Sequence, residues 1–197
     1  MNSTTIGVAN ANFVTPQLAV GGDLDMHSAT LADQQAVDLV DGGITHILDV
    51  RHECSDESVW QRVPHLTYRW EGIHDAGQRV PVAWFDTVVS WALHVLEDPD
   101  AKLLTHCHMG INRGPSAGYA VLLGLGWDPV EALDAIRSAR PIAYIAYAED
   151  ALRWHHWKTG ASPEGRRHDL ARVVQWREDN SLDIAKVIRR IRTEEAR

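Results

Sequence analysis

The sequence predicts an α/β domain with a central, parallel-rich sheet flanked by helices, followed by extra C-terminal helices. Short apolar runs that suit buried strands alternate with longer segments of helical periodicity. After residue 160 the strand signals stop and only helical patterns remain. We therefore expect an α/β domain over residues 1–160 and a helical extension over residues 161–197.

The first half of the chain contains three strand candidates. Leu18 to Gly22 suits a short strand and turn, and Leu31 to Val40 suits a helix that ends at Gly42-Gly43. The apolar run from Ile44 to Val50 predicts a buried strand, and Leu66 to Trp70 predicts the next one. Strands that alternate with helices in this way form a mainly parallel sheet covered by helices on both faces.

The following segment continues the alternation. A helix is predicted by apolar residues at helical spacing, and it ends before Asp98-Pro99-Asp100; these residues are Phe85, Val88, Val89, Ala92, Val95 and Leu96. Lys102 to Thr105 predicts a strand and Pro115 to Leu125 a helix. Asp128-Pro129-Val130-Glu131 has the residues of a helix start, and the helix continues to Arg137. Tyr147 to Trp157 predicts a further helix.

The C-terminal extension starts with a linker at Ser162-Pro163-Glu164-Gly165. Leu170, Val173 and Val174 indicate one amphipathic helix. A second helix is predicted to start at Ser181 and to present one apolar stripe, made by Ile184, Val187, Ile188 and Ile191. We expect these helices to pack against the domain; a contact with a partner or a second copy is the alternative.

The strongest functional signal is the segment His106-Cys107-His108-Met109-Gly110-Ile111-Asn112-Arg113, a strand-to-helix loop. Backbone N–H groups in such a loop, with the positive end of the helix dipole, bind a tetrahedral oxyanion. The same field favours a cysteine thiolate. Arg113 can bind two phosphate oxygens at once. A thiolate beneath a bound phosphate is a nucleophile for phosphoryl transfer.

At these residues the chain resembles the cysteine-dependent tyrosine and dual-specificity phosphatases, whose signature is His-Cys-x-x-Gly-x-x-Arg, and it is most similar to their compact dual-specificity branch. The resemblance implies that Cys107 attacks phosphorus to form a phosphocysteine intermediate and that Arg113 binds the phosphate. Gly110 would give the loop its bend, and His106 would help to hold the thiolate. The phosphoryl oxygens would be bound by the loop N–H groups of His108, Met109, Gly110, Ile111, Asn112 and Arg113.

Two other interpretations of Cys107 are available. A lone cysteine in a soluble protein is often a small buried hydrophobe. A His-Cys-His cluster could also indicate a zinc-binding site. Adjacent residues on an extended segment, however, point to opposite faces and do not easily coordinate one metal ion. We predict no metal and no other cofactor, because the loop dipoles and Arg113 supply the charge stabilisation.

The leaving group needs a proton donor, and general acid catalysis typically accelerates a reaction by about 10²–10⁴-fold. Asp75 follows a predicted strand in a loop with two glycines, which suits a mobile flap. In the compact phosphatases the acid is an aspartate in the loop before the helix that precedes the catalytic strand. Asp75 matches that position. Glu71 and Asp86 are the alternatives, and Asp86 is expected at the surface of a helix.

One position departs from the family pattern. The family arginine is usually followed by Ser or Thr, whose hydroxyl helps the thiolate leave when water hydrolyses the phosphocysteine. This chain has Gly114 there. Ser116 is expected to cap the following helix, with a hydroxyl contact to Cys107 as the alternative. The glycine leaves the attack step intact but puts rapid breakdown of the intermediate in question. A non-catalytic, phosphate-binding pseudophosphatase is therefore an alternative.

The substrate class is only partly constrained. The loop carries no lysine, which argues against highly charged substrates, so we expect phosphotyrosine, with phosphoserine and phosphothreonine as further substrates. Asn112 before the arginine also resembles the RNA 5′-triphosphatase branch, which generally lacks the aspartate acid. Phosphatases of RNA 5′ ends, nucleotides or inositol phosphates are thus a second possibility.

Composition sets further limits. The formal charge is −8 for 197 residues, and the acidic balance lies in residues 1–160. Such a chain does not favour nucleic acid or an anionic membrane as partner. No apolar run is long enough to span a bilayer, and the N-terminus lacks the pattern of a secretory signal. We expect a cytoplasmic protein that acts on a phosphorylated protein or a small phosphomonoester; the sequence does not determine its oligomeric state.

A few other residues have more than one interpretation. Cys54 follows the strand that ends at Val50, and in some relatives a cysteine near that place forms a reversible disulfide with the nucleophile. Arg51 and His52 could line the pocket, although a surface role is expected. Arg140 could contact substrate, but an arginine before a proline at a helix end is usually structural.

Overall fold

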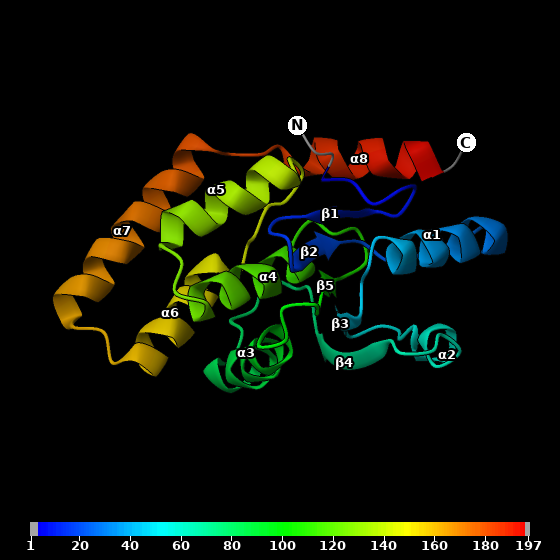
Figure 1. Ribbon diagram of the computed structural model, residues 1–197. Helices are drawn as coiled ribbons and strands as arrows, with labels where there is room; N and C mark the ends of the chain where they lie inside the picture. The colour runs from blue at the N-terminus through cyan, green and yellow to red at the C-terminus, as the bar shows by residue number, and fades with distance from the viewer. Residues whose placement is uncertain (1–3, 196–197) are drawn as a thin grey trace.

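The computed structural model describes residues 4–195, which form a five-stranded sheet between two layers of helices (Figure 1). The strand order is β1-β2-β5-β3-β4, and within these residues only the β1–β2 pair is antiparallel. The strands are β1 (Ala11–Phe13), β2 (Leu18–Gly21), β3 (His46–Arg51), β4 (Thr67–Ile73) and β5 (Leu103–His106). The predicted α/β class with a mainly parallel sheet is confirmed.

The helices cover both faces of the sheet. Figure 1 shows α1 and α2 on one side and α3, α4 and α6 on the other. The bounds are α1 (Ala29–Asp41), α2 (Glu57–Trp60), α3 (Val82–Leu96), α4 (Arg113–Gly124), α5 (Pro129–Ala139), α6 (Ala148–Thr159), α7 (Pro163–Asp179) and α8 (Ile184–Glu195). β1 and α2 were not predicted from the sequence, because they have three and four residues and therefore too few positions to show a periodicity.

Local signals explain where several helices begin. Ser28 caps α1 by accepting a hydrogen bond from the Leu31 N–H at 3.3 Å. Asp128 caps α5 by accepting from the N–H groups of Val130 and Glu131, and Pro129 takes the first helical position. A side-chain cap satisfies backbone donors that would otherwise lack a partner.

The centre of the fold is β5 with the helix that follows it. β5 lies between β2 and β3, and its four residues are buried. Every residue of α4 from Arg113 to Leu123 is also buried, as expected for a helix enclosed on all sides. The loop between β5 and α4 therefore lies at the carboxyl end of a central strand, where open parallel sheets bind ligands.

The first C-terminal helix, α7, is an integral part of the packing. Val173 is fully buried and Trp176 is 6% exposed, and both join the main core cluster. The Trp176 indole N–H donates to Asp134 at 2.6 Å, and Arg172 forms a two-pronged ion pair with Asp128 at 2.7 and 2.8 Å.

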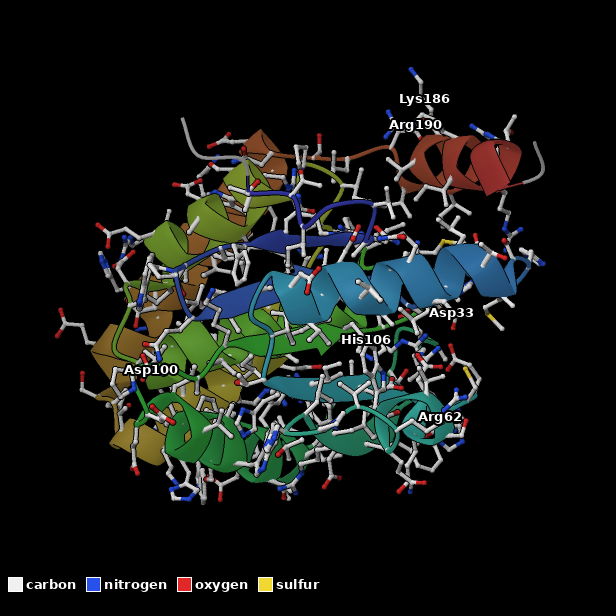
Figure 2. All side chains as sticks on the ribbon, turned by 45° about the vertical axis from the view of Figure 1, so that its right-hand side comes forward. Asp33, Arg62, Asp100, His106, Lys186 and Arg190 are labelled. Carbon is white, nitrogen blue, oxygen red and sulfur yellow. The ribbon has the colours of Figure 1, made fainter. Side chains whose placement is uncertain are left out.

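Helix α8 is more exposed. Its apolar stripe is only half-buried, and Lys186 extends away from the rest of the molecule (Figure 2). Among the described residues, no helix is both long and apolar enough to cross a membrane.

Candidate functional site

The site is built around Cys107, the first residue after β5. Its thiol is free and 3% exposed. Its N–H donates to the Gly21 carbonyl at 3.2 Å and so continues the parallel ladder with β2. Five residues later the chain enters α4, with Asn112 at the N-cap. The loop that was predicted to bind phosphate is therefore a short strand-to-helix connection, with the positive end of the α4 dipole beside it.

The carbonyl groups of residues 108–111 are turned toward the surrounding fold. Four consecutive carbonyls accept hydrogen bonds from outside the loop: His108 O from Asp23 N (2.9 Å), Met109 O from Arg140 Nη2 (2.9 Å), Gly110 O from Arg140 Nε (2.6 Å) and Ile111 O from Tyr144 N (2.7 Å). The peptide bonds are trans, so each C=O and the next residue's N–H point in opposite directions. The N–H groups of residues 109–112 consequently face the other side of the loop, as an oxyanion site requires.

Gly110 makes the bend in this loop. Its φ is +64°, in the left-handed region that favours glycine. A Cβ at this position would lie 2.4 Å from the carbonyl carbon of Gly21 and 2.5 Å from Arg140 Nη2. The structure thus gives both a conformational and a steric reason for glycine here.

Arg113, in the first turn of α4, is held by Glu53. Its Nη1 and Nη2 donate to the two Glu53 oxygens, both at 2.6 Å, and Nη1 also donates to the Ile73 carbonyl at 3.0 Å. The hydrogen bond from Arg113 lowers the pKa of Glu53 to about 2. These contacts occupy three of the five guanidinium donors.

The remaining donors of Arg113 lie on one edge, formed by Nε–H and the second Nη2 hydrogen. Nε is buried and has no hydrogen-bond partner among the described residues. Burial lowers the pKa of Arg113, but the hydrogen bond to Glu53 and a negative charge on Cys107 raise it above its ordinary value. A side-on edge of this kind matches two oxygens of a phosphate group. Glu53 therefore fixes the orientation in which that edge is open.

Asp75 lies at the same edge. Its Oδ2 is 3.5 Å from Arg113 Nε, and its Oδ1 accepts hydrogen bonds from Asn112 Nδ2 (2.6 Å) and from the Tyr147 hydroxyl (3.2 Å). The structure thus brings together the aspartate, the arginine and the cysteine loop. The two alternative acids have other partners: Glu71 pairs with Arg69, and Asp86 pairs with Lys158.

Behind the cysteine lies a buried charged cluster around Arg51. This side chain is 1% exposed and contacts three carboxylates, Asp23 at 3.3 Å, Asp49 at 2.6 Å and Asp56 at 2.7 Å. The Tyr68 hydroxyl donates to Asp49 Oδ2 at 2.6 Å. The expected surface role of Arg51 is therefore wrong.

His106 completes this cluster. Figure 2 shows it inside the molecule, at the end of β5. Its Nε2 is 3.7 Å from Asp49 Oδ2, and burial lowers the pKa of its imidazole. Asp49, Asp56 and His106 are close enough together to hold a metal ion. However, Arg51 Nη2 already lies between the two carboxylates and supplies the positive charge there.

The structure corrects the expectation for Ser116. The N-cap of α4 is Asn112, and the Ser116 hydroxyl instead donates to Asn112 Oδ1 and accepts from the Tyr147 N–H, both at 3.3 Å. Ser116 is the fourth residue of the helix, because α4 starts at Arg113 and not at Pro115. The hydroxyl therefore joins Asn112, at the end of the loop, to the start of α6.

Gly114 fits against the backbone of β5. A Cβ would lie 2.9 Å from the Cα and carbonyl carbon of His106 and 3.0 Å from the Cys107 nitrogen. The Thr105 hydroxyl donates to the Gly114 carbonyl at 2.9 Å and fixes this approach. A serine or threonine at this position would require α4 to move away from β5.

Two residues of this site, Glu53 and Tyr147, were not predicted from the sequence. Glu53 follows Arg51 and His52 in the chain, and the signal for it was an acidic residue just after β3, the strand that pairs with β5. Tyr147 has no local signal, because it meets Asp75 from 72 residues away. Cys54 is free and half-buried, and burial raises the pKa of its thiol.

A cavity of about 560 Å³ opens beside the loop. His108, whose ring contacts Asp23 at 2.7 Å, forms part of its wall. Ile142 lies on the same wall, and α8 contributes Arg190 and Ile191. Cys107, Asp75 and Arg113 are not among the residues that line this cavity.

No family model and no curated protein matches this chain by sequence. Solved structures do match its fold. PTPMT1 in complex with PI(5)P superimposes with a TM-score of 0.64 and 16% identity, over 77% of this chain and 97% of that one. Human DUSP28 gives 0.61 and 17%, over 76% and 95%.

A third match is the human tyrosine phosphatase-like serine/threonine/tyrosine-interacting protein, with a TM-score of 0.61 and 18% identity, over 76% of this chain and 97% of that one. At these identities the likeness establishes the fold.

Proposed function

We propose that this chain, which has the fold of the dual-specificity phosphatases, is a cysteine-dependent phosphatase that hydrolyses phosphomonoesters through a phosphocysteine intermediate. The observation that carries the proposal is the open edge of Arg113. Within residues 4–195 this buried Nε–H has no hydrogen-bond partner and only the Asp75 carboxylate 3.5 Å away, and an unsatisfied buried donor is costly unless a ligand pairs with it.

Each residue of the site has a separate role in the proposed reaction. The Cys107 thiolate attacks phosphorus, while Arg113 and the loop N–H groups bind the phosphoryl oxygens and stabilise the charge that develops on them. Asp75 gives a proton to the leaving oxygen, and the S–P bond forms as the O–P bond breaks. Asp75 then takes a proton from the water that hydrolyses the phosphocysteine. Bound phosphate would take over the Arg113 edge that Asp75 faces here.

We further propose phosphotyrosine, and phosphoserine or phosphothreonine, as substrates in a reducing cytoplasm. The absence of lysine from the loop over residues 107–113 supports substrates of low charge. Inositol phosphates, nucleotides and RNA 5′ ends share the same phosphomonoester chemistry. A panel that compares phosphopeptides with these compounds separates the substrate classes.

One observation favours a second candidate, a phosphate-binding module that releases product slowly or not at all. Gly114 has no hydroxyl to give to the departing thiolate, and Ser116 is engaged with Asn112 and Tyr147. The chain has the cysteine, arginine and aspartate that the attack on phosphorus needs. It lacks the hydroxyl that would help the thiolate leave when the phosphocysteine is hydrolysed.

The test is hydrolysis of para-nitrophenyl phosphate with a chelator present, for the wild type, Cys107→Ser and Asp75→Asn. We expect turnover by the wild type, no activity in Cys107→Ser and a rate about 10²-fold lower in Asp75→Asn. A single burst equal to the enzyme concentration would favour the binding module. Full activity in Cys107→Ser would refute the cysteine mechanism.

A further inference from the structure

A second buried arginine lies on the other side of the phosphate loop. Arg140, at the end of α5, is 4% exposed. Its guanidinium donates hydrogen bonds to five oxygen atoms: Gly110 O (2.6 Å), Met109 O (2.9 Å), Asn10 O (3.3 Å), Asn10 Oδ1 (2.6 Å) and Asn12 Oδ1 (2.9 Å). The side chain therefore joins the loop to Asn10, just before β1, and to Asn12 within β1.

None of these acceptors is charged. Arg113 has Glu53, and Arg51 has three aspartates, but Arg140 has no ion pair in the part of the chain that the structure describes. Burial lowers the pKa of Arg140 to about 10, and the charge of Cys107 opposes that shift. Arg140 therefore keeps its proton at pH 7. A buried charge is expensive unless an opposite charge compensates it, and a thiolate at Cys107, whose charge acts on Arg140, would supply one.

The hydrogen bonds of Arg140 also determine how the loop is oriented. Two of the four outward-facing loop carbonyls, those of Met109 and Gly110, are held by this one side chain. Because the peptide bonds are trans, holding these carbonyls turns the N–H groups of Gly110 and Ile111 to the opposite side. Removing the guanidinium would release both peptide groups at once.

We propose that Arg140 is a positioning residue: it fixes two peptide groups of the phosphate loop from behind, and its uncompensated charge favours the thiolate form of Cys107. The effect on the phosphate rests on the proposed function, whereas the effect on the thiolate does not. Other titratable groups around the loop are Arg113 with Glu53 and Asp75, His106 with Asp49, and His108 with Asp23.

The first test measures the rate of Cys107 alkylation by iodoacetamide against pH, in a Cys54→Ser background so that one thiol reacts. Arg140→Met removes the charge and the donors. We expect the pH of half-maximal alkylation to rise by about one unit, the size of effect that one nearby opposite charge has on a titration. Arg137→Met is the matched control, because Arg137 lies on the same helix and donates to Ala143 and Asn180 instead of the loop.

The second test keeps the arginine. Asn12→Asp places a carboxylate where the structure has an amide oxygen 2.9 Å from Arg140 Nη1. It should also raise the alkylation midpoint, whereas Ser90→Asp on the exposed face of α3 should not. If Arg140→Met does not unfold cooperatively and is therefore not properly folded, the alkylation midpoint of Asn12→Asp is the only result used to test the proposal. An unchanged midpoint in Asn12→Asp, or in a folded Arg140→Met, overturns the proposal.

Inorganic phosphate reports on the loop geometry. It should protect Cys107 from alkylation in the wild type and about tenfold less well in Arg140→Met. Equal protection in a folded Arg140→Met would remove the positioning role. If the wild type does not hydrolyse para-nitrophenyl phosphate, the proposed function fails, yet the alkylation midpoints still test Arg140.

Discussion

At the residue scale, Glu53 has the most direct influence on Arg113, the arginine that we propose binds phosphate. It occupies one edge of the Arg113 guanidinium and leaves the other edge open. The pKa of Glu53 falls from 4.5 to about 2. A carboxyl group with a depressed pKa contributes stability that is fully present above its unfolded value and is lost as the pH falls through the folded value. This ion pair should therefore remain intact throughout the neutral and mildly acidic range.

Glu53→Gln tests this role. The amide keeps the shape but loses the charge and one of the two acceptors, so the Arg113 edge should lose its fixed direction. We expect kcat/KM for para-nitrophenyl phosphate to fall by about 10²-fold, the typical cost of misplacing a catalytic group. Glu97→Gln, at an exposed pair with His94, is the control. Equal kcat/KM values in the two variants would show that the orientation of Arg113 does not depend on Glu53.

Gly114→Ser restores the hydroxyl of the family pattern, but this structure has no room for it. Its Cβ would lie 2.9 Å from His106 backbone atoms. We expect a loss of about 1–3 kcal/mol in the free energy of unfolding, as overpacking typically costs, without faster breakdown of the phosphocysteine. Urea denaturation and burst kinetics measure both. Gly165→Ala is the control, because its Cβ would make ordinary contacts in α7. A stable Gly114→Ser enzyme with faster turnover would contradict the steric argument.

At the scale of the elements, the two C-terminal helices differ in how they are attached. The α7 side chain of Val173 is fully buried, whereas Val187 on α8 is half-buried. The sequence pattern predicted an apolar stripe on both helices, but only the stripe of α7 contains a fully buried side chain among the residues compared.

A matched pair of substitutions measures the difference. Val173→Ala should cost about 2 kcal/mol in unfolding free energy, since it removes two buried carbon groups and leaves a cavity. Val187→Ala should cost under about 1 kcal/mol, because its side chain keeps contact with water. Thermal or urea unfolding of both variants gives the comparison. Equal costs would mean that α8 is packed as tightly as α7.

At the scale of the whole molecule, the buried cluster around Arg51 should set the response to acid. Burial alone would raise the pKa of Asp49, but the hydrogen bonds from Arg51 hold it below its ordinary value of 3.8. Burial lowers the pKa of His106 below its ordinary value of 6.5. Both groups stabilise the fold above these ordinary values, and that stability is lost as the pH falls through the folded values.

We therefore expect the free energy of unfolding to decrease from about pH 6.5 downward, first through His106 and then through Asp49. His106→Asn should flatten the first part of this decrease, whereas His94→Asn, at a side chain that is 82% exposed, should leave it unchanged. Urea titrations between pH 8 and pH 4 provide the measurement. A decrease of the same size in His106→Asn would assign the sensitivity to another group.

The sequence predicted the parts of the site that depend on neighbours in the chain. Periodicity located the long helices, and the Cys107–Arg113 spacing located the loop. The parts it did not predict are contacts between distant segments: Glu53 with Arg113, Tyr147 with Asp75, and Arg140 with the loop carbonyls. Ser116 was misassigned for the same reason, because its hydroxyl partner depends on where Tyr147 lies.

The four carbonyls of residues 108–111, which are held by groups outside the loop, determine how this protein could be divided into fragments. Their anchors come from Asp23, Arg140 and Tyr144, and Arg140 is in turn bound by Asn10. The shortest fragment that contains every anchor therefore runs from residue 10 to residue 144. Neither half of the chain alone would form the loop. If the eight-residue motif were transplanted into another scaffold, its peptide groups would lose the hydrogen bonds that orient them. Protection of Cys107 by phosphate would thus report that folding is complete.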